Sequence, residues 1–277
     1  MKASVIVRFA RLDDRSSILR LVEHTWDWGD YIPEVLDEWL SGSDSRLFVG
    51  ELDSEIVALT HLSICEGRVG WLEGLRVKEG LRNRGIATLV AQHIAQYARS
   101  EGIHKLRMMI YSDNYASIRH AKKSGFSVRG TFRRVRFRGT SSTRPVLFCR
   151  TAEWSSVPAN ALEDYCGLLY TSWKWLDLNQ ARFEKLVASG KVFSDGEQIL
   201  IHSSDYADDN AKRCAEVGFT SSMDEALVGS LASSLVKTGY QTVEFVIPSN
   251  WYFSKEEFSE DIIDENRHEQ LIFEREL

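Results

Sequence analysis

The segment from residue 69 to residue 111 restricts the fold of this chain more than any other. Val69 to Val77 alternates like a strand, and Leu106 to Tyr111 reads as a second, buried strand. Between them one helical face is apolar, with Ile86, Leu89, Val90, Ile94, Tyr97 and Ala98, and Gly102 marks its end. A strand, a helix and a strand at this length imply a right-handed crossover between parallel strands. The sequence therefore predicts an α/β protein with a mixed sheet.

The flanking sequence extends this pattern on both sides. The elements predicted before it are a strand at Val5 to Phe9, a helix after Asp13 and Asp14, a short helix after Pro33, and an antiparallel hairpin of Leu47 to Glu51 with Glu55 to Ser63. Those predicted after it are a helix from Asn114 to Gly125 and strands at Phe126 to Arg138 and Val146 to Thr151. The first part of the chain thus holds enough strands for one sheet.

The length of 277 residues favours two domains. We place the boundary at Trp154 to Pro158, giving domains at residues 1–153 and 159–277. The segment EGIHKLRMMIYSDN, ending at Asn114, is matched by KTGYQTVEFVIPSN, ending at Asn250, and each follows an apolar-faced helix. A second, smaller and degenerate copy of the first domain is predicted, although two ordinary α/β units could also look alike by chance.

Composition excludes several classes of function. Lysine and arginine total 34 against 40 acidic residues, giving a net charge of −6, which argues against a nucleic-acid or anionic-membrane partner. No segment is long and apolar enough for a signal peptide or a membrane span. The four cysteines form no CxxC pair, so neither a metal site nor a disulfide framework is indicated. We expect a cytoplasmic protein without a bound metal.

Two further clusters of residues are interpreted as structural. Arg129, Arg133, Arg134, Arg136 and Arg138 alternate as in a strand, and we expect a solvated sheet edge rather than a nucleic-acid site. The tryptophans of the C-terminal half are expected to be core residues; they are Trp154, Trp173, Trp175 and Trp251.

The turn between the strand ending at Val77 and the helix starting near Ile86 contains Arg82-x-x-Gly85-x-Ala87. A helix N-terminus offers unpaired N–H groups and a partial positive charge, and glycine lets phosphate oxygens approach the backbone. The turn has neither a Walker loop nor a dinucleotide-binding fingerprint. An arginine-rich turn that only caps a helix would have the same spacing, so the motif alone leaves both readings open.

In its context this turn resembles the acetyl-CoA-binding motif of the GNAT acetyltransferase superfamily. The strand end Leu75-Arg76-Val77 precedes it, and Asn114 and Gly125-Phe126 stand where that family has its Asn and its Gly-Phe. The resemblance covers residues 5–151 and implies acetyl-CoA as cofactor and direct transfer of its acetyl group to an amine. The residues it implies for the pyrophosphate are Arg82, Asn83, Arg84, Gly85, Ile86, Ala87 and Thr88, and for the pantetheine arm Leu75, Arg76 and Val77, with Asn114 as a further cofactor residue.

One position departs from the family. The tyrosine often found seven residues after the Asn, the acid that protonates the leaving thiolate, is Ala121 here. The adjacent His120 is turned away by about 100° on a helix. Because a thiol with a pKa of about 8.5 leaves tolerably as thiolate near neutral pH, the missing acid need not abolish activity.

The reaction also needs a neutral amine. Glu73, two residues before Leu75, is our candidate base, which would draw the proton through water. A solvated strand carboxylate or a salt-bridge partner is the equally weighted alternative.

Trp26, Asp30 and Tyr31 are our candidates for the acceptor pocket. They lie between the first two predicted helices, and aromatic rings with a carboxylate suit a cationic group. The segment Gly29 to Pro33 also resembles the subgroup that contains the vertebrate histidine N-acetyltransferase. Two alternatives remain open: a helix connection whose aromatic side chains fill the core, and Asp30 as a helix cap.

We therefore expect an N-acetyltransferase that acts on a small-molecule amine, with an amino acid as one candidate. A protein or peptide N-terminal acetyltransferase and a non-catalytic acyl-CoA sensor are the alternatives. Residues 220–224 read Thr-Ser-Ser-Met-Asp where a second phosphate loop would belong, so we expect one cofactor per chain. The sequence does not indicate an oligomeric state.

Overall fold

The computed structural model describes residues 4–26, 29–138, 152–194, 196–207, 212–223, 228, 231, 234–235, 237–251, 262–265 and 268–277. The chain divides into two compact units. The first unit consists of residues 1–110, 114–127 and 273–277, and the second of residues 111–113 and 128–272. Among the described residues, no helix is both long and apolar enough to cross a membrane.

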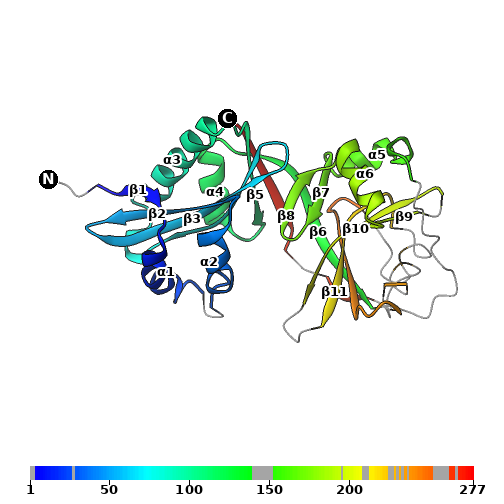
Figure 1. Ribbon diagram of the computed structural model, residues 1–277, viewed down its shortest axis with the longest axis horizontal. Helices are drawn as coiled ribbons and strands as arrows, with labels where there is room; N and C mark the ends of the chain where they lie inside the picture. The colour runs from blue at the N-terminus through cyan, green and yellow to red at the C-terminus, as the bar shows by residue number, and fades with distance from the viewer. Residues whose placement is uncertain are drawn as a thin grey trace. The chain divides into compact units, whose positions relative to one another are not determined.

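The first unit is a mixed sheet with helices on both faces (Figure 1). Its strands are β1 (Ile6–Phe9), β2 (Ser45–Leu52), β3 (Glu55–Cys65), β4 (Val69–Val77), β5 (Lys105–Tyr111) and the end of β14 (Gln270–Glu276), in the order β1-β2-β3-β4-β5-β14. Its helices are α1 (Arg15–Val22), α2 (Ile32–Ser41), α3 (Ile86–Ser100) and α4 (Tyr115–Lys123), with one-turn 3-10 helices at Leu12–Asp14 and Glu79–Leu81. The predicted hairpin and the predicted parallel crossover are both confirmed: β2, β3 and β4 are antiparallel, and β4 is parallel to β5.

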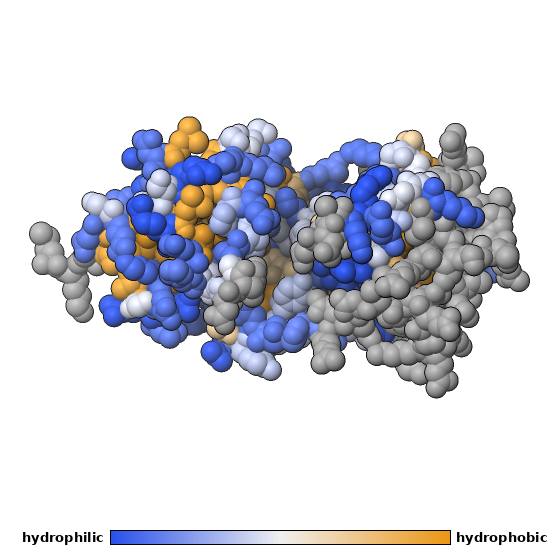
Figure 2. All heavy atoms as spheres, turned by 90° about the horizontal axis from the view of Figure 1, so that it is seen from below, coloured by the Kyte–Doolittle hydropathy of each residue, from blue (hydrophilic) through white to orange (hydrophobic). Residues whose placement is uncertain are grey.

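Apolar side chains at helical spacing hold α1 and α2 against β2 and β3. The buried cluster consists of Ile18, Val22, Ile32, Leu36, Trp39, Leu47, Val49, Ile56 and Leu59. Trp39 is 6% exposed, which confirms it as a core residue. On the face drawn in Figure 2, apolar residues interrupt the otherwise hydrophilic surface of this unit.

The second unit repeats the strand order of the first. Its strands are β6 (Ser127–Arg138), β7 (Leu168–Thr171), β8 (Lys174–Asp177), β9 (Val192–Ser194), β10 (Ile199–Ala207), β11 (Arg213–Thr220), β12 (Thr242–Pro248) and β13 (Ile262–Glu265). Its helices are α5 (Ala159–Asp164) and α6 (Gln180–Ala188), with a 3-10 turn at Trp154–Ser156. In the order β9-β10-β11-β12-β6 the first three strands are antiparallel, β11 and β12 are parallel, and β6 is antiparallel to β12. The first unit has the same arrangement in β2-β3-β4-β5-β14.

The units differ from the predicted domains in two strands. Residues 128–138 of β6 belong to the second unit, and residues 273–277 belong to the first. The reason is strand pairing, because β6 pairs with β12 over residues 132–138. Whether residues 1–153 and 159–277 fold as separate domains stays a prediction. The predicted strand at Val146 to Thr151 lies outside the described residues.

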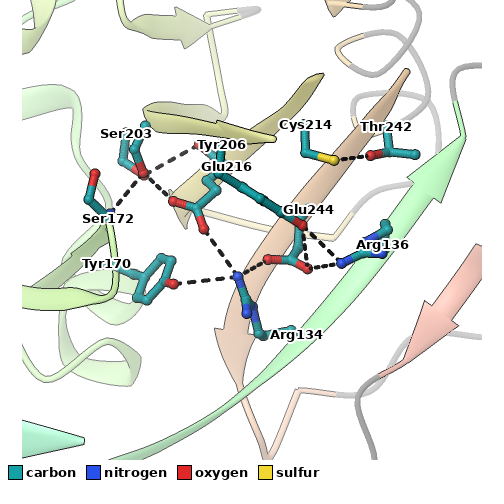
Figure 3. Close-up of polar contacts among 11 residues, drawn as sticks. Arg134, Arg136, Tyr170, Ser172, Ser203, Tyr206, Cys214, Glu216, Thr242 and Glu244 are labelled. Atoms are coloured by element: carbon teal, nitrogen blue, oxygen red, sulfur yellow. Dashed lines mark hydrogen bonds and ion pairs between the residues drawn. The ribbon is translucent and has the colours of Figure 1, made fainter. Parts of the chain in front are cut away.

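The structure also corrects the interpretation of the arginine run. β6 is not a solvated edge, since β12 pairs along it, and Arg134 is only 7% exposed. Its guanidinium lies against Glu216 at 3.1 Å and also contacts Glu244, which is 3.2 Å from Arg136 (Figure 3). Burial raises the pKa of Glu216. Alternation in sequence indicates a strand, but it does not show that acidic partners will lie beside it on β12 and one strand further on β11.

The four tryptophans of the C-terminal half meet the core prediction unevenly. Trp175 is fully buried, as expected, and Trp154 and Trp251 are half-buried, but Trp173 is 45% exposed. It lies in the turn between β7 and β8, and the Arg134 guanidinium stacks 4.4 Å from the centroid of its ring. An arginine side chain, rather than a hydrophobic core, thus fixes this ring.

Candidate active site

The parallel strands β4 and β5 separate along their length. Their register pairs run from Val69 with Lys105 to Trp71 with Arg107, although β4 continues to Val77. The C-terminal half of β4 therefore presents backbone groups on its β5 side without strand pairing there. Leu75, Arg76 and Val77, the residues predicted to hold a pantetheine arm, all lie in this half.

A bulge at Gly74 gives β4 its bend. On β3, Leu59 faces Arg76 and His61 faces Glu73, so β4 has one extra residue between the two pairs. Gly74 has a φ of +68°, and a Cβ there would lie 2.7 Å from the Trp39 ring. Only glycine fits both conditions. The bulge places Glu73 at the point where the unpaired half of β4 begins.

The predicted phosphate loop follows directly from β4. Residues 82–85 are exposed, and Asn83 and Gly85 have φ values of +62° and +84°. Gly85 is the N-cap of α3, and nothing lies within 4 Å of the position that its Cβ would take. The first helical hydrogen bond runs from the Leu89 N–H to the Gly85 carbonyl, which leaves the N–H groups of the first turn directed out of the helix. The exposed backbone, the arginines and the helix dipole together can receive a phosphate.

Glu73 lies in a chain of polar contacts with two residues that the sequence reasoning missed. Its Oε1 is 3.1 Å from His61 Nδ1, and His61 Nε2 is 2.6 Å from Ser45 Oγ. The His61 ring stacks on Trp39 with centroids 4.2 Å apart and an interplanar angle of 9°. The signal in the sequence was Thr60-His61, two polar residues within an otherwise apolar, buried strand.

The predicted acceptor residues meet around Arg76. Asp30 binds the Arg76 guanidinium through both carboxylate oxygens, at 2.8 and 3.0 Å, and its side chain is 1% exposed. The guanidinium lies 4.3 Å from the centroid of the Trp26 ring and 5.6 Å from that of Tyr31. The structure thus brings Trp26, Asp30 and Tyr31 together, with Arg76 as the cation on their rings. Their role toward an acceptor stays a prediction.

Asp30 also contacts the start of the second helix, although the N-cap residue there is Tyr31. Its Oδ1 accepts a hydrogen bond of 3.1 Å from the Ile32 N–H at the beginning of α2. Burial, followed by the charge of Glu73, raises the pKa of Tyr31 to about 12. The Tyr31 ring centroid lies 6.1 Å from that of Trp39, on which His61, the partner of Glu73, is stacked, so the candidate base and the candidate acceptor residues adjoin the same tryptophan.

The remaining predicted positions lie on α4. Asn114 caps this helix, because its side chain accepts a hydrogen bond from the Ser117 N–H at 3.1 Å. Ala121 is 1% exposed, and its methyl group offers no proton to a thiolate. His120 is half-buried, and burial lowers its pKa.

The second unit has a counterpart of the strand separation, and a side chain fills it. The register pairs of β11 and β12 end at Val217 with Phe245. Beyond that point the Tyr165 hydroxyl donates to the Val246 carbonyl at 2.8 Å and accepts from the Thr220 N–H at 3.3 Å. Tyr165 is fully buried. Its hydroxyl occupies the backbone groups that a pantetheine amide would need in this unit.

The chain is similar to known proteins both within its first unit and over nearly its whole length. Residues 15–126 match the model of the acetyltransferase (GNAT) family. A Thermoplasma acidophilum protein provisionally assigned as an acetyltransferase has the same fold over 98% of this chain and 100% of its own, with a TM-score of 0.61 and 17% identity. The PaiA N-acetyltransferase of the same organism, solved with coenzyme A, covers 45% of this chain and 91% of its own, with a TM-score of 0.39 and 18% identity. No curated protein matches the chain.

Proposed function

We propose that this protein transfers the acetyl group of acetyl-CoA directly to the primary amine of a small molecule such as an amino acid. Residues 15–126 match the GNAT acetyltransferase family, which uses acetyl-CoA. One observation carries the proposal. The unpaired half of β4 begins at the candidate base and leads directly into the exposed arginine and glycine loop of residues 82–85. A thioester held along this strand would reach from Gly85 toward Glu73.

In this arrangement the loop binds the pyrophosphate and the strand binds the pantetheine arm. The first-turn N–H groups of α3, with Arg82 and Arg84, face the phosphates, while backbone groups of Leu75 to Val77 pair with the pantetheine amides. Asn114 is engaged as a helix cap, so its contribution to the cofactor is to fix the start of α4.

The chemistry requires that the amine lose a proton. An α-amine with a pKa near 8 is easier to deprotonate than a lysine near 10.4, and the difference of two to three units amounts to about 3 to 4 kcal/mol. This favours a small amine or an α-amine over a lysine side chain. Glu73, whose side chain is 22% exposed, is the carboxylate that receives the proton, directly or through one water.

The acceptor lies beside Trp26 and Tyr31 in this proposal. Arg76 already neutralises Asp30, so Glu73 supplies the negative charge that attracts an incoming ammonium group. The leaving thiolate takes its proton from water, since Ala121 offers none. Four cysteines without close pairs suit a reducing compartment, and we place this activity in the cytoplasm.

An amine panel tests this function. Release of free coenzyme A would be followed with amino acids, small amines and short peptides as acceptors, with Glu73→Gln as the impaired variant and the exposed Glu101→Gln as its control. We expect release with small amines and a loss of about 100-fold or more in Glu73→Gln alone. Preference for peptides would indicate the N-terminal acetyltransferase instead. Binding of acetyl-CoA without release for any acceptor would indicate a sensor.

A further inference from the structure

Three short contacts run from the core to the candidate base. Ser45 Oγ is 2.8 Å from the Trp39 carbonyl oxygen, Ser45 Oγ is 2.6 Å from His61 Nε2, and His61 Nδ1 is 3.1 Å from Glu73 Oε1. Each has the length of a hydrogen bond, and each therefore needs one proton.

The count of protons decides what the chain of contacts can do. A carbonyl oxygen cannot donate, so the first contact needs the single hydroxyl proton of Ser45. The second contact then needs a proton on His61 Nε2, and the third contact needs one between His61 Nδ1 and Glu73. When His61 is neutral and Glu73 is ionised, only two protons are present for these three hydrogen bonds. A third proton is needed for all three hydrogen bonds to form.

Burial restricts where that proton can enter. The His61 side chain is 3% exposed and stacked on Trp39, whereas the Glu73 side chain is 22% exposed. Of these two groups, only Glu73 offers appreciable surface to an acceptor. Among the described charged and titratable groups, Tyr31 at the start of α2 interacts with Glu73, and Arg76, bound to Asp30, lies against the Tyr31 ring.

We infer that His61 holds the proton that Glu73 removes from the attacking amine. This inference rests on the proposed function. As the amine nitrogen bonds to the acetyl carbon and the carbon–sulfur bond breaks, the amine N–H proton passes to Glu73 and is then shared with His61 Nδ1. The thiolate takes a proton from water, and the imidazolium later returns one to water. Glu73 is the catalytic residue, and His61 is its positioning and proton-holding partner.

The inference predicts a specific pH dependence. Histidine is the side chain whose charge ordinarily changes between about pH 5 and 8. At low pH the chain of contacts already holds its third proton and can accept no other. His61→Gln keeps a polar side chain at this place but cannot take up a proton. The ratio of wild-type to variant kcat/KM, measured with one amine, should therefore rise from near one at about pH 5.5 to about tenfold to a hundredfold at about pH 8.

Two controls separate this role from a structural one. Ser45→Ala removes both contacts of the Ser45 hydroxyl but leaves His61 and Glu73 paired, so its ratio to wild type should vary with pH much less than that of His61→Gln. His104→Gln changes an exposed histidine outside the site and should match the wild type throughout. A ratio for His61→Gln that does not vary with pH would overturn the inference, because it would mean that the histidine only supports the fold.

A measurement without turnover keeps the inference separate from the proposed function. The ¹⁵N NMR signals of the His61 ring in the full chain would be followed from pH 5 to 9 in wild type and in Glu73→Gln, with His61→Gln for assignment. We expect one ring nitrogen to take up a proton in this range and its midpoint to move to lower pH when the carboxylate is removed. The inference is contradicted if the His61 ring signals do not change with pH, or if they change at the same pH in wild type and in Glu73→Gln. This holds even if the amine panel succeeds. If no amine is acetylated, the proposed function fails, and these NMR signals still decide whether the pair shares a proton.

Discussion

Arg107 and Glu274 form a buried ion pair within the first unit although 167 residues separate them in the sequence, with Arg107 Nε 3.0 Å from Glu274 Oε2. Their side chains are 0% and 8% exposed. The Leu277 N–H also donates to the His104 carbonyl at 2.8 Å, so the end of β14 runs antiparallel to β5. The last residues of the chain are therefore part of the sheet that carries the candidate active site.

Glu274→Gln should destabilise this sheet, because it leaves the buried Arg107 charge without its full counter-charge. The expected loss is about 3 kcal/mol or more in the free energy of unfolding, measured by urea denaturation. Glu276→Gln is the matched control: its side chain is 69% exposed, and we expect a change within about 0.5 kcal/mol. Equal effects of the two variants would contradict the structural role of the pair.

Tyr165→Phe should weaken the second unit without creating a second cofactor site. Removing the hydroxyl leaves the Thr220 N–H and the Val246 carbonyl without this partner in a buried place, which costs about 1 to 3 kcal/mol. Tyr115→Phe, at a residue that is 69% exposed, should leave stability unchanged. Thermal melts and calorimetric titration with coenzyme A measure both effects. Binding of two coenzyme A molecules per wild-type chain would refute the inference that Tyr165 blocks a cofactor site between β11 and β12.

Asp30→Asn should cost stability as well as acceptor affinity. The substitution breaks the two-point contact with Arg76 at a side chain that is 1% exposed, so we expect a loss of about 3 kcal/mol. Asp37→Asn, whose ion pair with Arg15 is exposed, should leave stability nearly unchanged. In the folded fraction the positive charge of Arg76 is no longer neutralised and repels the incoming ammonium group, so the amine KM should rise several-fold while the acetyl-CoA KM stays constant. A stability loss with an unchanged amine KM would remove Asp30 from the acceptor site.

Tyr31 should stay protonated throughout the working range of the enzyme. Burial raises its pKa to about 12, so its hydroxyl carries its proton up to pH 10. Tyr31→Phe should therefore neither add nor remove a limb of the kcat/KM profile between pH 7 and 10, although the amine KM can change. An alkaline limb that disappears in Tyr31→Phe would show that this hydroxyl titrates during catalysis.

The sequence predicted the features that depend on neighbouring residues. Period-two and helical spacing located the crossover from β4 to β5, and the glycine at position 85 marked the helix start. The polar contacts from Ser45 through His61 to Glu73 were missed, because nothing in a single strand shows that His61 of β3 will face Glu73 of β4 beside a bulge. The contacts of Tyr165 with Val246 and Thr220 were missed for the same reason, since these residues are far apart in the sequence.

Long-range pairing also explains the arginine run. Arg134 and Arg136 alternate as surface residues of a strand do, but their partners Glu216 and Glu244 lie on strands far along the chain. Asp30 shows the related difficulty at short range. Its position before a helix was read as either a cap or a pocket residue, and only the structure added the Arg76 contact.

The phosphate loop is the feature on which the proposed activity depends, and Gly85→Asp tests it. The substitution puts a carboxylate and a Cβ where the phosphates would lie. Gly67→Asp is a close control, because Gly67 has a similar φ of +81°, equally open surroundings, and a place at the opposite end of β4. Both variants would carry the same added charge and a similar backbone strain.

The most direct measurement is therefore calorimetric titration of acetyl-CoA into wild type, Gly67→Asp and Gly85→Asp, each shown to be folded by circular dichroism. We predict one molecule bound per chain in wild type, the same in Gly67→Asp, and no detectable binding in Gly85→Asp. Unchanged affinity in a folded Gly85→Asp protein would contradict the assignment of residues 82–88 as the acetyl-CoA site.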